Sequence, residues 1–410
     1  MSALLGKVVW FRVAGCSRQL LICAALPILA SIGAMGYAQS PAPPQPSKPA
    51  ASPWALSTST MRWNEYACEL IARNQVGQFP ASRVLAYLNL GINNAIVSAR
   101  QQQKAIDGAA AGAAATVLAY MFPKDEQGIT ARLSGEMAAI GSNGRAGFAA
   151  GVDVGRASGA DVVAMAKSDR SELAWTGTLP EGADKWSSRA QPPRPPLGPR
   201  LGEMRTFFIA TGSEYRAPPP PAYDSAQFRE EVAKVRAVAD SRTNEQLRIA
   251  QYWETLSGSF AAGLWNDFAR GAISSHGLDE AASARVLAVM HMASVDATIA
   301  CHDSKYVYWV PRPTQADPDI RLAIVVPNHP SYPSNHACIS GTVGLLLDAQ
   351  FPDQNGRYFA MARQAGDSRV YGGIHYPMDL EQGYVIARKV AARALEVGVP
   401  ADKAFTPQGK

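Results

Sequence analysis

Charge is sparse in this sequence, and no segment beyond its beginning carries a tract of one sign. Charged residues make up 18% of the 410 residues, and the formal net charge is +5. Three positive charges lie in the first 38 residues, which contain no acidic residue, so the remainder carries only about +2. No stretch interleaves basic and aromatic residues. These absences argue against nucleic acid as a partner.

Cysteine is also scarce, and the histidines form no metal-binding pattern. Cys16 and Cys23 lie before residue 38, which leaves Cys68, Cys301 and Cys338. This odd number permits at most one internal disulfide; export would allow one between Cys301 and Cys338, although buried free thiols are the favoured expectation. No HExxH pair occurs, and carboxylates are few around the six histidines. We therefore expect no metal site.

Beyond the first 38 residues, no uncharged run is long enough to cross a membrane. At the N-terminus, a basic segment ends at Arg18, an apolar stretch follows over 20–35, and residues 36–38 are suited to signal cleavage. We interpret 1–38 as a signal peptide, with an uncleaved anchor as the alternative. The Pro-, Ala- and Ser-rich segment 39–58 is typical of a linker. The sequence thus predicts an exported, periplasmic or secreted protein without a stable membrane span after cleavage.

The rest of the chain shows helical periodicity and no convincing strand alternation. Apolar residues recur at helical spacing in 59–170 and again in 224–400, which predicts two helical halves. A Pro-rich segment, 171–223, separates them and is expected to be irregular. It is either an exposed linker or an ordered segment that covers the active site. The expected fold class is all-α.

Three short motifs in the final third concentrate the chemically useful side chains. They are Lys305 followed after six residues by Arg312-Pro313, then Pro333-Ser334-Asn335-His336, and finally Ser368-Arg369 followed by His375 and Asp379. Fixed cations stabilise the charged oxygens of a tetrahedral anion, and two imidazoles can act as nucleophile and proton donor. The motifs therefore predict a site for a phosphoryl group or a similar oxyanion.

Helix ends are expected to bring these motifs together. The helix that carries Lys305 should end before Arg312, because prolines flank that arginine. Ser334 is suited to the N-cap of a second helix, and Pro377 to the first turn of a third. Two helix N-termini would then face one site, where their unpaired N–H groups favour an anion.

In order and spacing, the motifs resemble those of the type 2 phosphatidic acid phosphatase (PAP2) and vanadium haloperoxidase superfamily. That pattern is K-x6-RP, then PSGH, then SR-x5-H-x3-D. Further similarity runs through 218–221, 241–246, 252–253 and 265–266, so that the resemblance covers about residues 60–395 and is strongest to the haloperoxidase-like branch. It implies an all-α, soluble, PAP2/haloperoxidase-like helical bundle.

The resemblance also implies residue roles. His375 would attack phosphorus to form a phosphohistidine, His336 would protonate the leaving oxygen and later activate water, and Asp379 would orient His375. The oxyanion would be held by Lys305, Arg312, Ser334, Asn335 and Arg369. One departure is Asn335, which stands where the family has glycine; glycine permits positive φ and close backbone approach, and asparagine tolerates only the first. His302 and His329 flank the motifs and would either line the pocket or be structural.

These features predict a metal-independent, acid-phosphatase-like phosphoester hydrolase that acts on a small phosphorylated substrate without a cofactor. One alternative is a vanadate-dependent haloperoxidase that holds vanadate through His375 and oxidises halide with hydrogen peroxide, because vanadate matches phosphate in charge and shape. A second is a non-catalytic oxyanion-binding protein, although it would have no use for His336 or for the pairing of His375 with Asp379. The sequence does not indicate the oligomeric state.

Overall fold

The computed structural model describes residues 58–190, 192–255 and 260–409. The predicted signal peptide, 1–38, and nearly all of the predicted linker, 39–58, lie outside these residues. The division of the rest into two helical halves and an irregular segment stays a prediction. The described residues form one compact unit.

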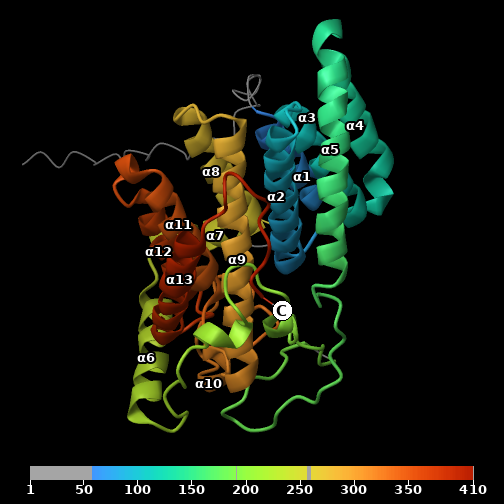
Figure 1. Cartoon of the computed structure of the whole chain (residues 1–410). Coiled ribbons are helices and arrows are strands. Elements are labelled where there is room, and N and C mark those ends of the chain that lie inside the picture. Colours follow the sequence, from blue (N-terminus) through green and yellow to red (C-terminus); the bar gives the residue numbers. More distant parts are fainter. Residues whose placement is uncertain (1–57, 191, 256–259, 410) are drawn as a thin grey trace, which may run out of the picture. The chain divides into compact units, whose positions relative to one another are not determined.

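The described residues form helices and no strands, which confirms the predicted all-α class (Figure 1). The sequence signals for several ends are visible as hydrogen bonds; Thr243 and Gln246, for example, form a reciprocal capping box before the seventh helix. The helices are α1 (Ser59–Arg73), α2 (Gln78–Gln101), α3 (Ile106–Met121), α4 (Glu126–Ala139), α5 (Ser142–Lys167), α6 (Ala226–Ser241), α7 (Asn244–Thr255), α8 (Phe260–Ser275), α9 (Glu280–Tyr308), α10 (Pro313–Ala316), α11 (Asn335–Gln350), α12 (Arg357–Tyr371) and α13 (Pro377–Val397).

Helix α9 is the central element of the unit. It contacts α2 on one side and α11 and α13 on the other, as Figure 1 shows. Among the described residues, only the stretch Glu280–Ala316 is long and apolar enough to span a membrane, and 94% of its most apolar window is buried inside the protein. That burial is the mark of a core helix, and α9 carries Lys305 at its C-terminal end.

Small residues allow α3 and α5 to pack closely. A Cβ added to Gly112 would lie 2.3 Å from the carbonyl oxygen of Val152, and one added to Gly155 would lie 2.1 Å from that of Ala109. These distances are far below van der Waals contact, so only glycine fits at these two positions. The Ala- and Gly-rich sequence thus produces a close helix pair at the edge of the unit.

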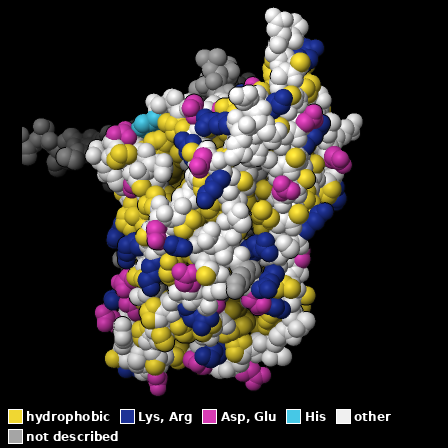
Figure 2. Space-filling model, in the orientation of Figure 1, with side chains coloured by type: hydrophobic (Ala, Val, Ile, Leu, Met, Phe, Trp, Pro, Cys, Tyr) yellow, Lys and Arg dark blue, Asp and Glu magenta, His cyan; other side chains and the backbone are white. Residues whose placement is uncertain are grey.

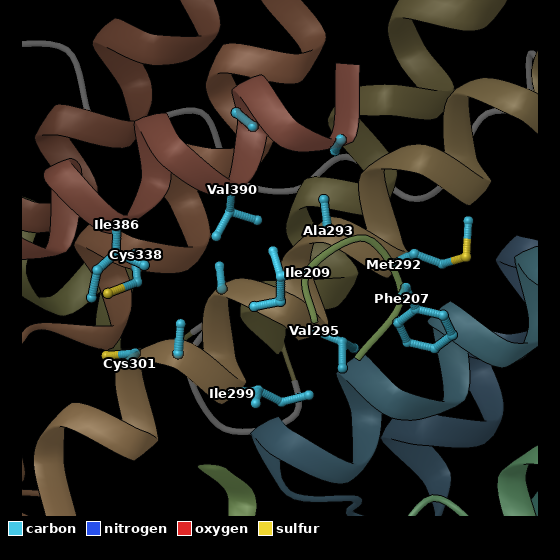
Figure 3. Close-up of a cluster of buried hydrophobic side chains, with 14 of the residues drawn as sticks. Phe207, Ile209, Met292, Ala293, Val295, Ile299, Cys301, Cys338, Ile386 and Val390 are labelled. Atoms are coloured by element: carbon cyan, nitrogen blue, oxygen red, sulfur yellow. The ribbon is translucent and has the colours of Figure 1, made fainter. Parts of the chain in front are cut away.

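In the segment between α5 and α6, the described residues form only short 3₁₀ turns as regular structure. It is anchored to α9 by Asp296, whose buried carboxylate accepts backbone N–H groups from Phe207 (2.7 Å), Phe208 (2.6 Å) and Ile209 (3.3 Å). Phe207 and Ile209 point into the same apolar cluster as Val295 of α9 (Figure 3). The segment is therefore an ordered cover over α9, at least where it contacts this helix.

On the face shown in Figure 2, Lys and Arg side chains are interspersed with Asp and Glu, and hydrophobic side chains lie between them. No concentration of one charge sign is visible on that face. The cations that the motifs contribute are instead buried: Lys305 and Arg312 are fully inaccessible, and Arg369 is 1% exposed.

Candidate active site

The three motifs lie at helix ends, as their prolines indicated. Helix α9 ends at Tyr308, where Trp309 adopts a left-handed conformation (φ 55°) and turns the chain. Arg312 follows as the N-cap of α10, whose first residue is Pro313. The chain thus reverses after Lys305, and Lys305 and Arg312 both turn into the core.

The second motif forms the start of α11. Ser334 occupies the N-cap position, as predicted, but its side chain makes no capping hydrogen bond, and Oγ is buried without a partner. Asn335 is the first helical residue and has no positive φ, so asparagine is accepted there without backbone strain. The Nε2 atom of His336 is also buried without a partner. These side chains and the unpaired N–H groups of the first turn form one polar surface.

The third motif ends at the start of α13. Pro377 is its first residue, and Asp379 accepts from the backbone N–H of Tyr376 (3.1 Å), which closes the first turn. The four-residue spacing brings Asp379 Oδ2 to 2.7 Å from Nδ1 of His375. Ser331 donates its hydroxyl to the same carboxylate oxygen at 2.6 Å. A carboxylate can only accept, so His375 carries its proton on Nδ1 and its Nε2 is a bare nitrogen.

Arg312 covers that bare nitrogen. Its Nη1 lies 3.0 Å from Nε2 of His375 and donates to the carbonyl oxygen of Ile374 at 2.8 Å. The same guanidinium donates to the carbonyl oxygen of His329 (2.9 Å) and approaches His329 Nδ1 (3.0 Å). Burial lowers the pKa of Arg312 to about 10, which still leaves it charged. Arg312 and the proposed nucleophile are therefore in direct contact.

Lys305 is directed at the protein backbone. Its ammonium donates to the carbonyl oxygens of Pro330 (3.0 Å), Ser331 (2.8 Å) and Pro333. An ammonium has three protons, so these three carbonyls use all of its donors. Burial lowers the pKa of Lys305 to about 8. In this structure Lys305 holds the loop before α11 and makes no free donor available to an anion.

Arg369 lies on the other side of the site. It donates to the carboxylate of Glu254 (3.1 Å), to the carbonyl oxygen of Ala250 (3.0 Å) and to the hydroxyl of Ser368 (2.8 Å). Its proximity contributes, after burial, to a pKa of His336 well below the usual value. Arg369 and His336 thus face the same space.

That space is a cavity of about 750 Å³. Four of the predicted site residues line it: Asn335, His336, Arg369 and His375. The other four lie immediately behind them. Arg312 and Asp379 contact His375, Lys305 contacts the loop just before α11, and Ser334 is the N-cap of α11. Most of the remaining wall is apolar and comes from the α1–α2 connection and from Leu197, Val325, Pro327 and Ile374.

Burial decides the protonation of the catalytic candidates. Burial, followed by the charges of Arg312 and Lys305, lowers the pKa of His375 well below its usual value, so this imidazole is neutral. Burial is also the main cause that lowers the pKa of His336 well below its usual value, so this imidazole is neutral too. Burial raises the pKa of Asp379 to about 6, against the opposing effect of the Ser331 hydroxyl. A neutral His375 with its proton held on Nδ1 is the form that can act as a nucleophile or a ligand.

Two participants, Ser331 and Glu254, were not foreseen from the sequence, whereas His329 was expected either to line the pocket or to be structural. Ser331 contacts the carboxylate of Asp379, Glu254 pairs with Arg369, and His329 contacts Arg312 and lines the cavity. Ser331 and His329 lie in the loop just before the second motif, and this nearness to the motif is a signal that the sequence contains. Glu254 is in α7, more than a hundred residues from Arg369, so no local signal existed. The roles of all the site residues remain predictions.

The chain is similar to known proteins in sequence and in fold. Residues 284–398, which carry the three motifs, match the profile of the PAP2 superfamily. No curated protein matches the chain at a significant level. Among solved structures, a bacterial vanadium-dependent iodoperoxidase superposes with a TM-score of 0.71 at 20% identity, over 82% of this chain and 95% of that one.

Two further solved structures have the same fold. The apo form of a bacterial vanadium-dependent chloroperoxidase gives a TM-score of 0.62 at 14% identity, over 77% of this chain and 92% of that one. The holo form of a bacterial vanadium-dependent chloroperoxidase gives a TM-score of 0.61 at 13% identity, over 84% of this chain and 93% of that one. Residues 284–398 thus match the PAP2 superfamily, and the described chain has the fold of bacterial vanadium haloperoxidases.

Proposed function

We propose that this protein is a vanadate-dependent haloperoxidase, with vanadate held in the cavity at His375. The observation that carries the proposal is the neutral His375, whose bare Nε2 lies beside a buried guanidinium at the cavity wall. The likeness in fold to an iodoperoxidase and to chloroperoxidases, over most of each chain, supports this reaction above the phosphatase reaction predicted from the motifs.

The residues present fit an oxyanion of this kind. Ser334 Oγ and His336 Nε2 are buried without protein partners, although such atoms are normally paired. Arg312 and Arg369 supply charge-assisted donors, and the start of α11 adds backbone N–H groups. His375 would hold the group through Nε2, and these donors would surround its oxygens. Bound vanadate would activate hydrogen peroxide for the oxidation of a halide ion.

The remaining chemistry belongs to the chain's own side chains. Asp379 keeps the proton of His375 on Nδ1, so that Nε2 stays available. His336 Nε2 has no internal partner and can take a proton from, or return one to, a group bound in the cavity. A negative charge bound beside His336 would raise its pKa and favour this exchange.

Phosphomonoester hydrolysis is the second candidate, because the same atoms serve it. His375 Nε2 would form the bond to phosphorus while the bond from phosphorus to the alcohol oxygen breaks, and His336 would give that oxygen a proton. Water would then attack phosphorus, transfer a proton to His336 and release phosphate and free His375. The unpartnered Nε2 of His336 favours this candidate over simple oxyanion binding, which needs no proton transfer.

The test is an assay of purified protein with iodide or bromide and hydrogen peroxide, and separately with p-nitrophenyl phosphate, each with and without orthovanadate. We expect vanadate to switch on halide oxidation, and His375→Ala to remove it. His276→Ala, which changes an exposed histidine paired with Asp353, is the matched control. Phosphate ester hydrolysis that vanadate inhibits, without any halide oxidation, would favour the second candidate. Activity that survives His375→Ala would overturn both.

Export is part of the same proposal. It depends on residues 1–38, whose basic, apolar and small-residue regions are typical of a signal peptide. Fractionation of cells that express the full chain, with N-terminal sequencing of the product, tests it. A product that stays in the cytoplasm with residues 1–38 intact would contradict it.

A further inference from the structure

Asn335 is the one motif residue that differs from the family pattern. Its side chain is hydrogen-bonded to a residue behind the cavity. Its Nδ2 lies 3.1 Å from Nε2 of His302, a residue of α9 that is fully buried. On the other side of that imidazole, Nδ1 lies 3.0 Å from the carbonyl oxygen of Gly198 in the covering segment. The amide of Asn335 is therefore oriented through a chain of hydrogen bonds that begins outside the motif.

These hydrogen bonds determine which way the amide of Asn335 faces, that is, where its Oδ1 and its Nδ2 lie. A carbonyl oxygen only accepts, so the proton of His302 is on Nδ1. Burial lowers the pKa of His302 to about 3, and Phe79 packs edge-on against the ring at 4.4 Å between centroids. The imidazole is neutral and its Nε2 only accepts. Asn335 must therefore present its NH₂ group to His302, which leaves Oδ1 as the free end.

Oδ1 of Asn335 is a buried acceptor without a donor. It has no hydrogen-bond partner in the structure, although Asn335 lines the cavity and is only 4% exposed. The groups expected to hold an oxyanion are otherwise mostly donors: Arg312, Arg369 and the backbone N–H groups of α11. His336 can change between acceptor and donor by taking up a proton, but an amide oxygen cannot. The carboxylate of Glu254 also lines the cavity, but it is paired with Arg369. Asn335 Oδ1 is thus a fixed acceptor of the site that has no donor of its own.

We propose that Asn335 makes the site selective for protonated oxyanions, because its Oδ1 accepts a hydrogen bond from an O–H group of the bound anion. Vanadate and phosphate carry such a group near neutral pH, and sulfate does not. An anion without a proton would leave Oδ1 unpaired and place two oxygens in repulsive contact. The inference rests on the oxyanion site proposed above, but it concerns which anion binds and not which reaction follows.

Inorganic phosphate and sulfate provide the test. At about pH 8, hydrogen phosphate and sulfate have the same charge and similar size and differ by one O–H group. Isothermal titration calorimetry of the purified protein with each anion measures the ratio of their dissociation constants. For the wild type we expect phosphate to bind about tenfold more tightly than sulfate or better, the effect of one buried unpaired acceptor.

In Asn335→Ala and Asn335→Gly the ratio should fall about tenfold, because the acceptor is gone. Asn93→Ala is the matched control, since Asn93 is a buried asparagine of α2 that lines no part of this cavity; its ratio should stay at the wild-type value. Equal binding of the two anions by the wild type overturns the inference, even if both variants fail to fold. A ratio unchanged in a folded Asn335 variant overturns it as well. Because the readout is binding, neither result depends on whether halide oxidation or ester hydrolysis is found.

Discussion

Nη1 of Arg312 lies 3.0 Å from Nε2 of His375, so a guanidinium donor occupies the lone pair of the imidazole that would hold vanadate or attack phosphorus. Both side chains are almost completely buried. An entering oxyanion offers Arg312 a charged acceptor, which forms a stronger hydrogen bond than a neutral imidazole. Binding of the anion would thereby release Nε2 for reaction.

Asp379 should be needed for turnover more than for folding. Ser331, His375 and Tyr376 all contact the same oxygen, Oδ2. Asp379→Asn therefore either keeps these contacts through Oδ1 without the negative charge that stabilises a protonated His375, or turns its NH₂ group to Nδ1 and moves the imidazole proton to Nε2. We expect turnover to fall by roughly 10²–10⁴-fold, the order seen when a histidine loses its orienting carboxylate. Steady-state kinetics measures this, with Asp367→Asn in α12 as the control. Undiminished activity in Asp379→Asn would show that His375 does not depend on this carboxylate.

Lys305 should act mainly through the loop before α11. Lys305→Met keeps the length of the side chain but leaves the buried carbonyls of Pro330, Ser331 and Pro333 without their donor. We expect a loss of about 2–5 kcal/mol of stability, together with weaker anion binding. Thermal unfolding and calorimetry measure the two effects, and Lys403→Met on the surface is the control. An unchanged Tm combined with lost anion binding would mean that the ammonium serves the anion directly.

Stability should fall as the pH drops below about 6.5. Burial lowers the pKa of five histidines, to about 3 for His291 and His302. In mildly acidic solution, the unfolded chain therefore binds protons at these histidines and the folded protein does not. Each such proton costs about 1.4 kcal/mol per pH unit until the folded pKa is reached. Asp296 and Asp379 oppose this trend, because burial raises their pKa to about 7 and about 6 and their contribution to stability grows as pH falls.

His276, whose pKa is raised by its contacts with Ala272 and Asp353, acts in the same direction as the two acids. The five buried histidines outnumber these three groups, so we expect acid destabilisation. Urea unfolding at about pH 7.5 and pH 5.5 measures it. His291→Gln can keep the hydrogen bond to Asn266 while removing one titrating group, and should therefore reduce the difference between the two pH values. Equal stability at both values would contradict the assignment of the buried histidines as neutral.

The contact between α3 and α5 should tolerate no side chain at Gly155. Gly155→Ala would place a Cβ 2.1 Å from the carbonyl oxygen of Ala109 and 2.8 Å from the backbone nitrogen of Ala113. Relief of this clash by separation of the helices should cost about 1–3 kcal/mol. Gly147→Ala in the same helix meets nothing within 4 Å and should stabilise by up to about 1 kcal/mol. Similar unfolding midpoints for the two variants would argue against close packing at this position.

Local features of the site could be predicted from the sequence. The ends of α9, α11 and α13 follow from proline and capping residues near the chain positions that they affect. His375 lies just before α13 and Asp379 lies in its first turn, so their closeness in sequence makes the hydrogen bond between them possible. The hydrogen bonds of Lys305 could not be predicted, because its partners are carbonyls more than twenty residues away in sequence.

The chain's order of residues alone determined the helical class, the helix ends and the set of cations, imidazoles and carboxylate, because these depend on neighbours a few positions apart. Tertiary structure alone decided that Lys305 secures a loop, that Glu254 pairs with Arg369, and that Asn335 turns its amide towards His302. These contacts join segments distant in sequence, and a buried polar group takes whichever partner the packing brings to it.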